Sequence, residues 1–178
     1  ISPSLDASLL GVHMARRAQP LDRRTIWIGF LGILLGVVSA FVAYALTGLI
    51  GLVTNIAFYG RFSSAFTSPA NNKLGLLVII VPVIGGLIVG MMAKWGSKAI
   101  RGHGIPEAME QILRNESRIP ARITWLKPVS SAIVIGTGGP FGAEGPIIAT
   151  GGALGSLLGQ LIHVTPDERK TLLAAGAA

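Results

Sequence analysis

The chain has 178 residues, of which 51% are hydrophobic and only 13% are charged, and its mean hydropathy is +0.63. A soluble domain of ordinary composition carries about twice that share of charged residues, so the composition indicates an integral membrane protein. The net charge of +7 gathers at the edges of apolar stretches rather than on one basic face, which argues against nucleic-acid binding. No cysteine is present, which excludes disulfides and thiolate chemistry.

The first 22 residues mix apolar and basic side chains and lack the order of a signal peptide. They predict an amphipathic helix at the membrane surface that ends before Pro20. The chain begins at Ile1 and stops at Ala178 inside an apolar run, so we expect it to be a piece of a longer protein. We divide it into an N-terminal amphipathic, cytosolic segment, 1–22, and a transmembrane domain, 23–178, truncated at its C-terminus.

Two long stretches carry no charged side chain, one between Arg24 and Arg61 and one from Leu74 to Ala93. About 20 apolar residues are enough to cross a membrane, so each stretch predicts a membrane helix. The fold class is therefore an all-α, polytopic membrane helical bundle. The helices are expected at Asp22 to about Tyr59, Leu74 to about Ile100, Pro106 to about Asn115, Arg122 to about Ile135, Pro146 to about His163, and from Pro166 onward.

The charged residues predict the orientation of these helices. Residues 1–24 hold four basic and two acidic side chains, 61–73 hold two basic ones, and 94–127 hold seven basic and three acidic ones. Basic residues mark the cytoplasmic side of membrane proteins. We therefore expect a multi-pass protein of the cell membrane with a cytoplasmic N-terminus and with the connection 61–73 outside.

Glycines recur at a spacing of four residues in three of the predicted helices. This spacing lets membrane helices pack closely, so these positions predict helix–helix contacts rather than a transport path. They are Gly32 and Gly36, Gly86 and Gly90, and Gly151, Gly155 and Gly159.

Two glycine-rich loops each lead into a proline and then an apolar stretch: Gly102-His103-Gly104-Ile105-Pro106 and Gly142-Ala143-Glu144-Gly145-Pro146. Glycine lets backbone amides approach a ligand closely, and proline is tolerated in the first turn of a helix. The unpaired amides and the dipole at a helix N-terminus favour an anion. Two such loops in a membrane protein predict a path for anions.

These loops resemble the GSGIP and G(K/R)EGP elements of the CLC chloride channels and proton-coupled anion transporters, in the same order and about forty residues apart. Lys127 and the run Gly136-Thr137-Gly138-Gly139 between them fit the same family. The resemblance implies the first half of a CLC-like inverted-repeat fold, with helices that break at mid-membrane. It also implies a homodimer of complete protomers, each with its own pore, and a second repeat that this chain lacks.

The resemblance makes Glu144 the gate and the proton acceptor. Its carboxylate can occupy the amides that would otherwise hold an anion, and protonation withdraws it. A glutamate that only stabilises the start of a helix is the structural alternative, although an acid at membrane depth is costly without a function. The resemblance places the anion near His103, Gly104, Ile105, Gly145, Pro146 and Ile147, with Gly102, Pro106 and Gly142 completing the two helix starts.

Two residues depart from the family pattern. His103 stands where serine is usual, and Ala143 stands where a basic residue is usual. Chloride is the expected anion, with nitrate and fluoride as alternatives. His103 either donates an N–H to the anion or bonds to backbone carbonyls of its own loop. Glu107 is expected only to stabilise a helix dipole.

Other classes of function fit the sequence less well. No Gly-Lys-Ser/Thr follows the run 136–139 and no strand precedes it, so a nucleotide-dependent enzyme is not expected. His103 and Glu107 have helical spacing but no third ligand near them, and we expect neither a metal nor a cofactor. A non-transporting structural or regulatory membrane subunit remains the alternative. Within transport, the sequence leaves open a passive channel and an anion/proton exchanger.

Overall fold

The computed structural model describes residues 22–97, 100, 101, 106, 109, 110, 116–162 and 164–178, and none of these residues belongs to a strand. The all-α prediction is confirmed. The predicted N-terminal amphipathic helix and most of the predicted helix 106–115 lie outside the described residues. The helices are α2 (Arg23–Tyr59), η1 (Pro69–Asn71), η2 (Gly75–Ile79), α3 (Ile80–Trp95), α5 (Ala121–Gly136), α6 (Glu144–Leu161) and α7 (Pro166–Ala177).

Helix α2 is the longest element, with 37 residues. At 1.5 Å per residue it is about 55 Å long, which exceeds the apolar core of a bilayer, about 30 Å. It ends at Gly60, whose left-handed backbone (φ 63°) lets its amide bond to the carbonyl of Ile56 at 3.2 Å. Within the described residues, α2 and the segment Gly75–Trp95 are the two helical stretches long and apolar enough to cross a membrane.

The second apolar stretch does not form one helix from Leu74 to Ile100. It begins as the 3₁₀ helix η2, continues as α3 and ends at Trp95. The α-helix begins only at Ile80 because Pro82 has no amide to donate and is tolerated only in the first turn of an α-helix. The prediction of a single helix was therefore too long at both ends.

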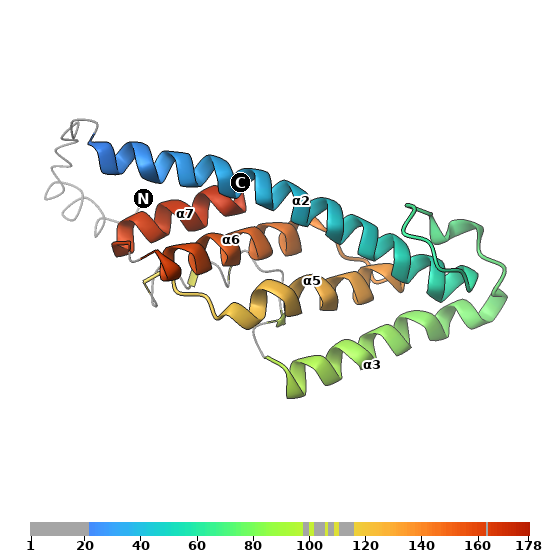
Figure 1. Cartoon of the computed structure of the whole chain (residues 1–178). Helices are drawn as coiled ribbons and strands as arrows, with labels where there is room; N and C mark the ends of the chain where they lie inside the picture. Colours follow the sequence, from blue (N-terminus) through green and yellow to red (C-terminus); the bar gives the residue numbers. More distant parts are fainter. Residues whose placement is uncertain (1–21, 98–99, 102–105, 107–108, 111–115, 163) are drawn as a thin grey trace, which may run out of the picture.

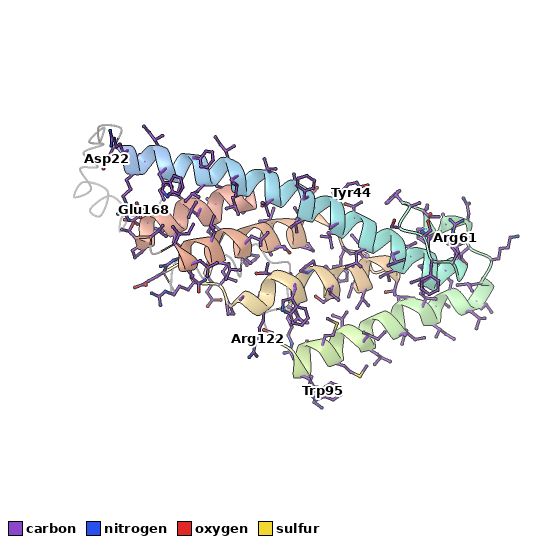
Figure 2. The ribbon with its side chains drawn as sticks, in the orientation of Figure 1. Asp22, Tyr44, Arg61, Trp95, Arg122 and Glu168 are labelled. Carbon is purple, nitrogen blue, oxygen red and sulfur yellow. The ribbon has the colours of Figure 1, made fainter. Side chains whose placement is uncertain are left out.

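The helices lie side by side in the order α2, α7, α6, α5 and α3 (Figure 1). Helix α7 runs along the first half of α2, and α6 packs against both α7 and α5. Charged side chains lie at the two ends of the bundle, with Asp22 and Glu168 at one end and Arg61 at the other (Figure 2). Between these ends, α2 and α3 expose large apolar side chains, including those of Phe41 and Leu87.

Glycines let α6 and α7 approach each other at the level of their backbones. A Cβ atom at Gly151 would overlap the carbonyl of Gly176, and one at Gly155 would overlap the carbonyl of Leu172. A Cβ at Gly159 would lie 2.8 Å from Cγ of Arg169. The packing role predicted for these three glycines is confirmed.

The other predicted glycine pairs behave differently. A Cβ at Gly32 would make an ordinary contact of 3.6 Å with Cβ of Ala175, whereas a Cβ at Gly36, Gly86 or Gly90 would meet nothing within 4 Å. For these last three positions the prediction of helix packing was wrong within the described chain. The reason is that spacing alone does not say which face of a helix has a neighbour.

The connection after α2 is held by one buried amide. Asn55 is fully buried, and its Nδ2 donates to the carbonyls of Gly51, Ser63 and Ala65, each at 2.9 Å. Its Oδ1 accepts a bond of 2.8 Å from Nε of Arg61. One side chain of α2 thus bonds to the backbone and to a side chain of the connection 61–73. These bonds hold the connection against the end of α2.

At the opposite end, an ion pair joins the starts of α2 and α7. The guanidinium of Arg24 donates to both carboxylate oxygens of Glu168, with Nη2 2.9 Å from Oε2. Glu168 also completes a capping box with Thr165, whose backbone amide lies 2.8 Å from Oε2. These bonds, the one from Arg24 first, lower the pKa of Glu168 from 4.5 to about 2.

This shift predicts a loss of stability in acid. Because the pKa of Glu168 is lower in the folded state, its ionised carboxylate stabilises the fold above pH 4.5. This stabilisation is lost as the pH falls from 4.5 toward 2. We expect the melting temperature of the complete protein in detergent to fall less over this range in Glu168→Gln than in wild type. Asp167→Asn, an exposed acid in the same turn, is the control. Parallel curves for wild type and Glu168→Gln would contradict the prediction.

Candidate anion site

Helix α6 begins inside the bundle and not at its end. Ala143 and Ile147 pack against a cluster formed by Leu46, Ile50 and Ala132. Leu46 and Ile50 precede the end of α2 by 13 and 9 residues, which is roughly 14 to 20 Å at 1.5 Å per residue. The start of α6 therefore lies beside an apolar part of α2, well away from the charged ends of the bundle.

The first turn of α6 offers amides that the helix itself does not use. The amide of Ile147 donates to the carbonyl of Ala143 at 3.0 Å, which is the first bond of the helix. Pro146 has no amide. An α-helix provides no acceptor for its first amides, so those of Glu144 and Gly145 are left to face an acceptor from elsewhere.

Glu144 is the first residue of α6, and it is exposed. Within the described part of the chain, its carboxylate makes no hydrogen bond or ion pair. A negative charge at this position is favoured by the helix dipole. Among the described residues, this carboxylate is the one acidic group that lies at a helix start beside an apolar stretch of α2.

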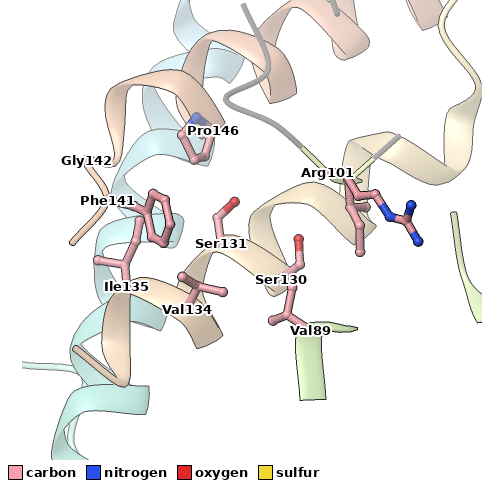
Figure 3. A pocket seen from close by; sticks show the side chains of 10 residues that line it. Val89, Arg101, Ser130, Ser131, Val134, Ile135, Phe141, Gly142 and Pro146 are labelled. Atoms are coloured by element: carbon pink, nitrogen blue, oxygen red, sulfur yellow. The ribbon is translucent and has the colours of Figure 1, made fainter. Parts of the chain in front are cut away.

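A cavity of about 230 Å³ lies next to this helix start. Figure 3 shows Phe141 and Pro146 on one side of it, the hydroxyls of Ser130 and Ser131 along its floor, and Arg101 on the opposite side. Arg101 directly precedes the motif 102–106. The cavity therefore lies between Arg101, which adjoins the first motif, and Gly142 and Pro146, which belong to the second motif.

Lys127 anchors the chain just before the first motif, 102–106. Its side chain is only 2% exposed, and its ammonium donates to the carbonyl of Ile100 at 3.0 Å. Ile100 also packs in a cluster with Ala93 and Leu126. Helix α5 therefore fixes the chain immediately before Gly102.

The run 136–139 ends α5 and turns the chain. Gly138 has φ 94°, a left-handed backbone that suits glycine, and the amide of Gly139 donates to the carbonyl of Val134 at 2.9 Å. The hydroxyl of Thr137 donates to the carbonyl of Ile133 at 2.7 Å. These bonds turn the chain back toward the start of α6.

The structure describes only part of the predicted site. Gly142, Glu144, Gly145, Pro146 and Ile147 lie together around the first turn of α6. Pro106 is described without its neighbours, and the remaining predicted residues, Gly102, His103, Gly104, Ile105 and Glu107, lie outside the described residues.

The hydroxyls of Ser130 and Ser131 that line the cavity were not predicted from the sequence. Lys127 was predicted as one of the charges of a basic segment and as a residue that fits the CLC pattern, but its burial against Ile100 was not predicted. The sequence carries no local signal for this burial, because the partner of Lys127 is a backbone carbonyl 27 residues away.

A helix that starts within an apolar bundle, next to a cavity, is typical of membrane transport proteins built from broken helices. The family model described as voltage gated chloride channel matches residues 85–178. The chain belongs to this family, the CLC family, and is therefore part of an integral membrane protein.

Individual relatives agree with this assignment. A ClcB-like chloride channel protein of Ralstonia nicotianae is 33% identical over 104 residues, covering 56% of this chain and 24% of that protein. The H(+)/Cl(−) exchange transporter ClcA of Citrobacter koseri is 31% identical over 154 residues, covering 79% and 31%. The voltage-gated ClC-type chloride channel ClcB of Yersinia pseudotuberculosis is 27% identical over 156 residues, covering 83% and 36%.

The chain thus spans between 24% and 36% of the length of these three relatives. No solved structure gives a significant match.

Proposed function

We propose that the complete protein carries chloride across the cell membrane and that this chain forms the first half of its anion path. The observation that carries the proposal is the position of Glu144, an exposed acid at a helix start beside an apolar part of α2. The names of the relatives, which include both channels and an exchanger, support chloride as the substrate.

In the proposed mechanism, Glu144 competes with the anion. When ionised, its carboxylate occupies the amides at the start of α6, and when protonated it leaves them to chloride. Partial charges of amides and hydroxyls suit this task better than a lysine or arginine would. A full positive charge in a low dielectric holds an anion too tightly to release it quickly.

The proposed anion ligands are the backbone groups of Gly104, Ile105, Gly145 and Ile147. His103 would lie at the inner mouth of the site and Glu144 at the outer one. The amide of Ile147 is engaged with Ala143 in the described state, so it could serve the anion only if that bond opened. We further propose a homodimer, a cytoplasmic N-terminus and a connection 61–73 outside. Proton coupling and a second repeat are parts of the same proposal.

The proposal is tested by chloride efflux from liposomes containing the complete protein. Efflux well above that of protein-free vesicles supports transport, and its absence supports the alternative of a non-transporting membrane subunit. A chloride gradient that drives protons into the vesicles identifies an exchanger. Chloride flux without proton movement identifies a channel.

His103 provides a prediction about selectivity. If its ring lines the inner site, His103→Ser replaces a broad N–H donor with a compact hydroxyl and changes the ratio of chloride to nitrate flux. Exchange of one hydrogen-bond donor is expected to alter the preference about two- to twelve-fold. Chloride, nitrate and fluoride fluxes are compared in the same vesicles. Ratios that stay constant within about twofold would assign His103 to a role inside its loop.

A further inference from the structure

Arg169, near the start of α7, is a buried cation without a counterion. Its side chain is 6% exposed, and its Nη1 donates to the backbone carbonyl of Glu116 at 3.1 Å. Its Nε is buried and has no hydrogen-bond partner. Among the described residues no carboxylate pairs with it, because Glu168 is taken by Arg24 and the carboxylate of Glu116 lies 3.5 Å from Arg118.

A buried guanidinium without a counterion requires an anion. Removing a charge from water is costly unless the charge is paired and hydrogen-bonded. Within the described chain, Arg169 has one neutral acceptor for five donor hydrogens. The missing partner must therefore come from outside the described residues or from a ligand.

Arg169 lines a cavity of about 510 Å³ together with Arg118, Gln160 and Val164. The side chain of Arg118 is 62% exposed, so the cavity has one guanidinium at its base and a second one at its mouth. The amide of Gln160 is fixed by bonds to the carbonyl of Ile119 and the hydroxyl of Ser156, each at 3.1 Å. Two guanidiniums supply the positive charge and the N–H donors that bind a phosphate group.

A second cavity, of about 230 Å³, shares Val164 with the first. Its other lining residues are Arg24, Trp27, Ile28 and Ile162, so it is mostly apolar. A basic cavity and an apolar cavity on either side of one residue, Val164, fit an amphipathic molecule better than a free ion. The residues that line the two cavities come from the starts of α2 and α7, the end of α6 and the segments next to them. The starts of α2 and α7 lie at the same end of the bundle (Figure 1).

We propose that this pair of cavities binds an anionic phospholipid, with its phosphate between Arg118 and Arg169 and its apolar part against Trp27. The end of the bundle that holds it is the one whose basic residues predict a cytoplasmic position, where anionic lipid headgroups attract arginine and lysine. This site is separate from the start of α6 and takes no part in the transport path.

The test uses the complete protein in neutral detergent and follows its melting temperature as short-chain phosphatidylglycerol or phosphatidylcholine is added. The wild type is expected to be stabilised by phosphatidylglycerol but not by phosphatidylcholine at equal concentration. Arg118→Gln, at an exposed position that tolerates change, is expected to weaken the apparent affinity for phosphatidylglycerol at least about tenfold. Arg122→Gln is the matched control, because Arg122 is an exposed arginine in the first turn of α5, four residues after Arg118, and lines neither cavity.

The proposal would be overturned if the two lipids raised the melting temperature equally. It would also be overturned if phosphatidylglycerol stabilised Arg118→Gln as it does the wild type. Inorganic phosphate forms a further arm of the experiment. Stabilisation by phosphate equal to that by phosphatidylglycerol, lost in Arg118→Gln, would overturn the assignment to a lipid. Chloride efflux is measured separately, so failure of the lipid site leaves the transport proposal standing, and the reverse also holds.

Discussion

In the complete protein, Glu144→Gln is expected to make chloride flux nearly independent of external pH and to abolish any coupled proton movement. Glutamine has nearly the shape of glutamate but no charge, so it cannot act as a bound anion at the start of α6. Nor can it accept and release a proton. The wild-type flux, by contrast, should rise as the pH falls, because protonation withdraws the competing carboxylate from the amides of Glu144 and Gly145.

The measurement is chloride flux into liposomes from about pH 4.5, near the ordinary pKa of glutamate, to about pH 7.5. Asp167→Asn is a close control, since Asp167 is an exposed acid in the first turn of α7 but lies at the end of the bundle. This control should keep the wild-type pH profile. If Glu144→Gln keeps it too, Glu144 is not the gate and only stabilises the start of its helix.

Gly155→Ala is expected to destabilise the packing of α6 against α7 strongly. The added methyl group would overlap the backbone carbonyl of Leu172, a fully buried residue of α7. A side chain could rotate away from such a contact, but a carbonyl can move only if α7 moves. Overpacking of this kind costs about 1 to 3 kcal/mol, and more where backbone is displaced.

Gly36→Ala is the matched control for this substitution. The chemical change is the same and also falls within a helix, but nothing lies within 4 Å of the new methyl group. Alanine favours a helix over glycine by about 1 kcal/mol, so this variant is expected to be neutral or slightly more stable. Thermal unfolding of both variants in detergent compares them, and equal melting temperatures would contradict the proposed backbone contact between α6 and α7.

The start and end signals of several helices could be predicted from the sequence because they depend on local chemistry. The capping box of Thr165 and Glu168 with Pro166 marks the start of α7. The start of α6 was predicted at Pro146 but lies at Glu144, because the bond from Ile147 to Ala143 begins the helix ahead of the proline. Pro146 is tolerated there since its missing amide has no acceptor in the first turn.

The contacts that shape the candidate site could not be predicted in this way. Lys127 bonds to the carbonyl of Ile100, 27 residues away, and Arg24 pairs with Glu168 across 144 residues. Such partners depend on how the helices pack. No local pattern distinguishes a lysine at a membrane edge from one whose ammonium is buried against a carbonyl.

The close contact between α6 and α7 has a consequence for the timescale of the gating proposed for Glu144. Since backbone meets backbone at Gly151 and Gly155, α6 cannot slide without separating from α7. Glu144, at the exposed tip of α6, can change position by rotation about its own side-chain bonds. Rotation of an exposed side chain takes picoseconds to nanoseconds, whereas helix shifts take microseconds to milliseconds. We therefore expect the opening rate at this site to follow the arrival of protons and not a slow rearrangement of the bundle.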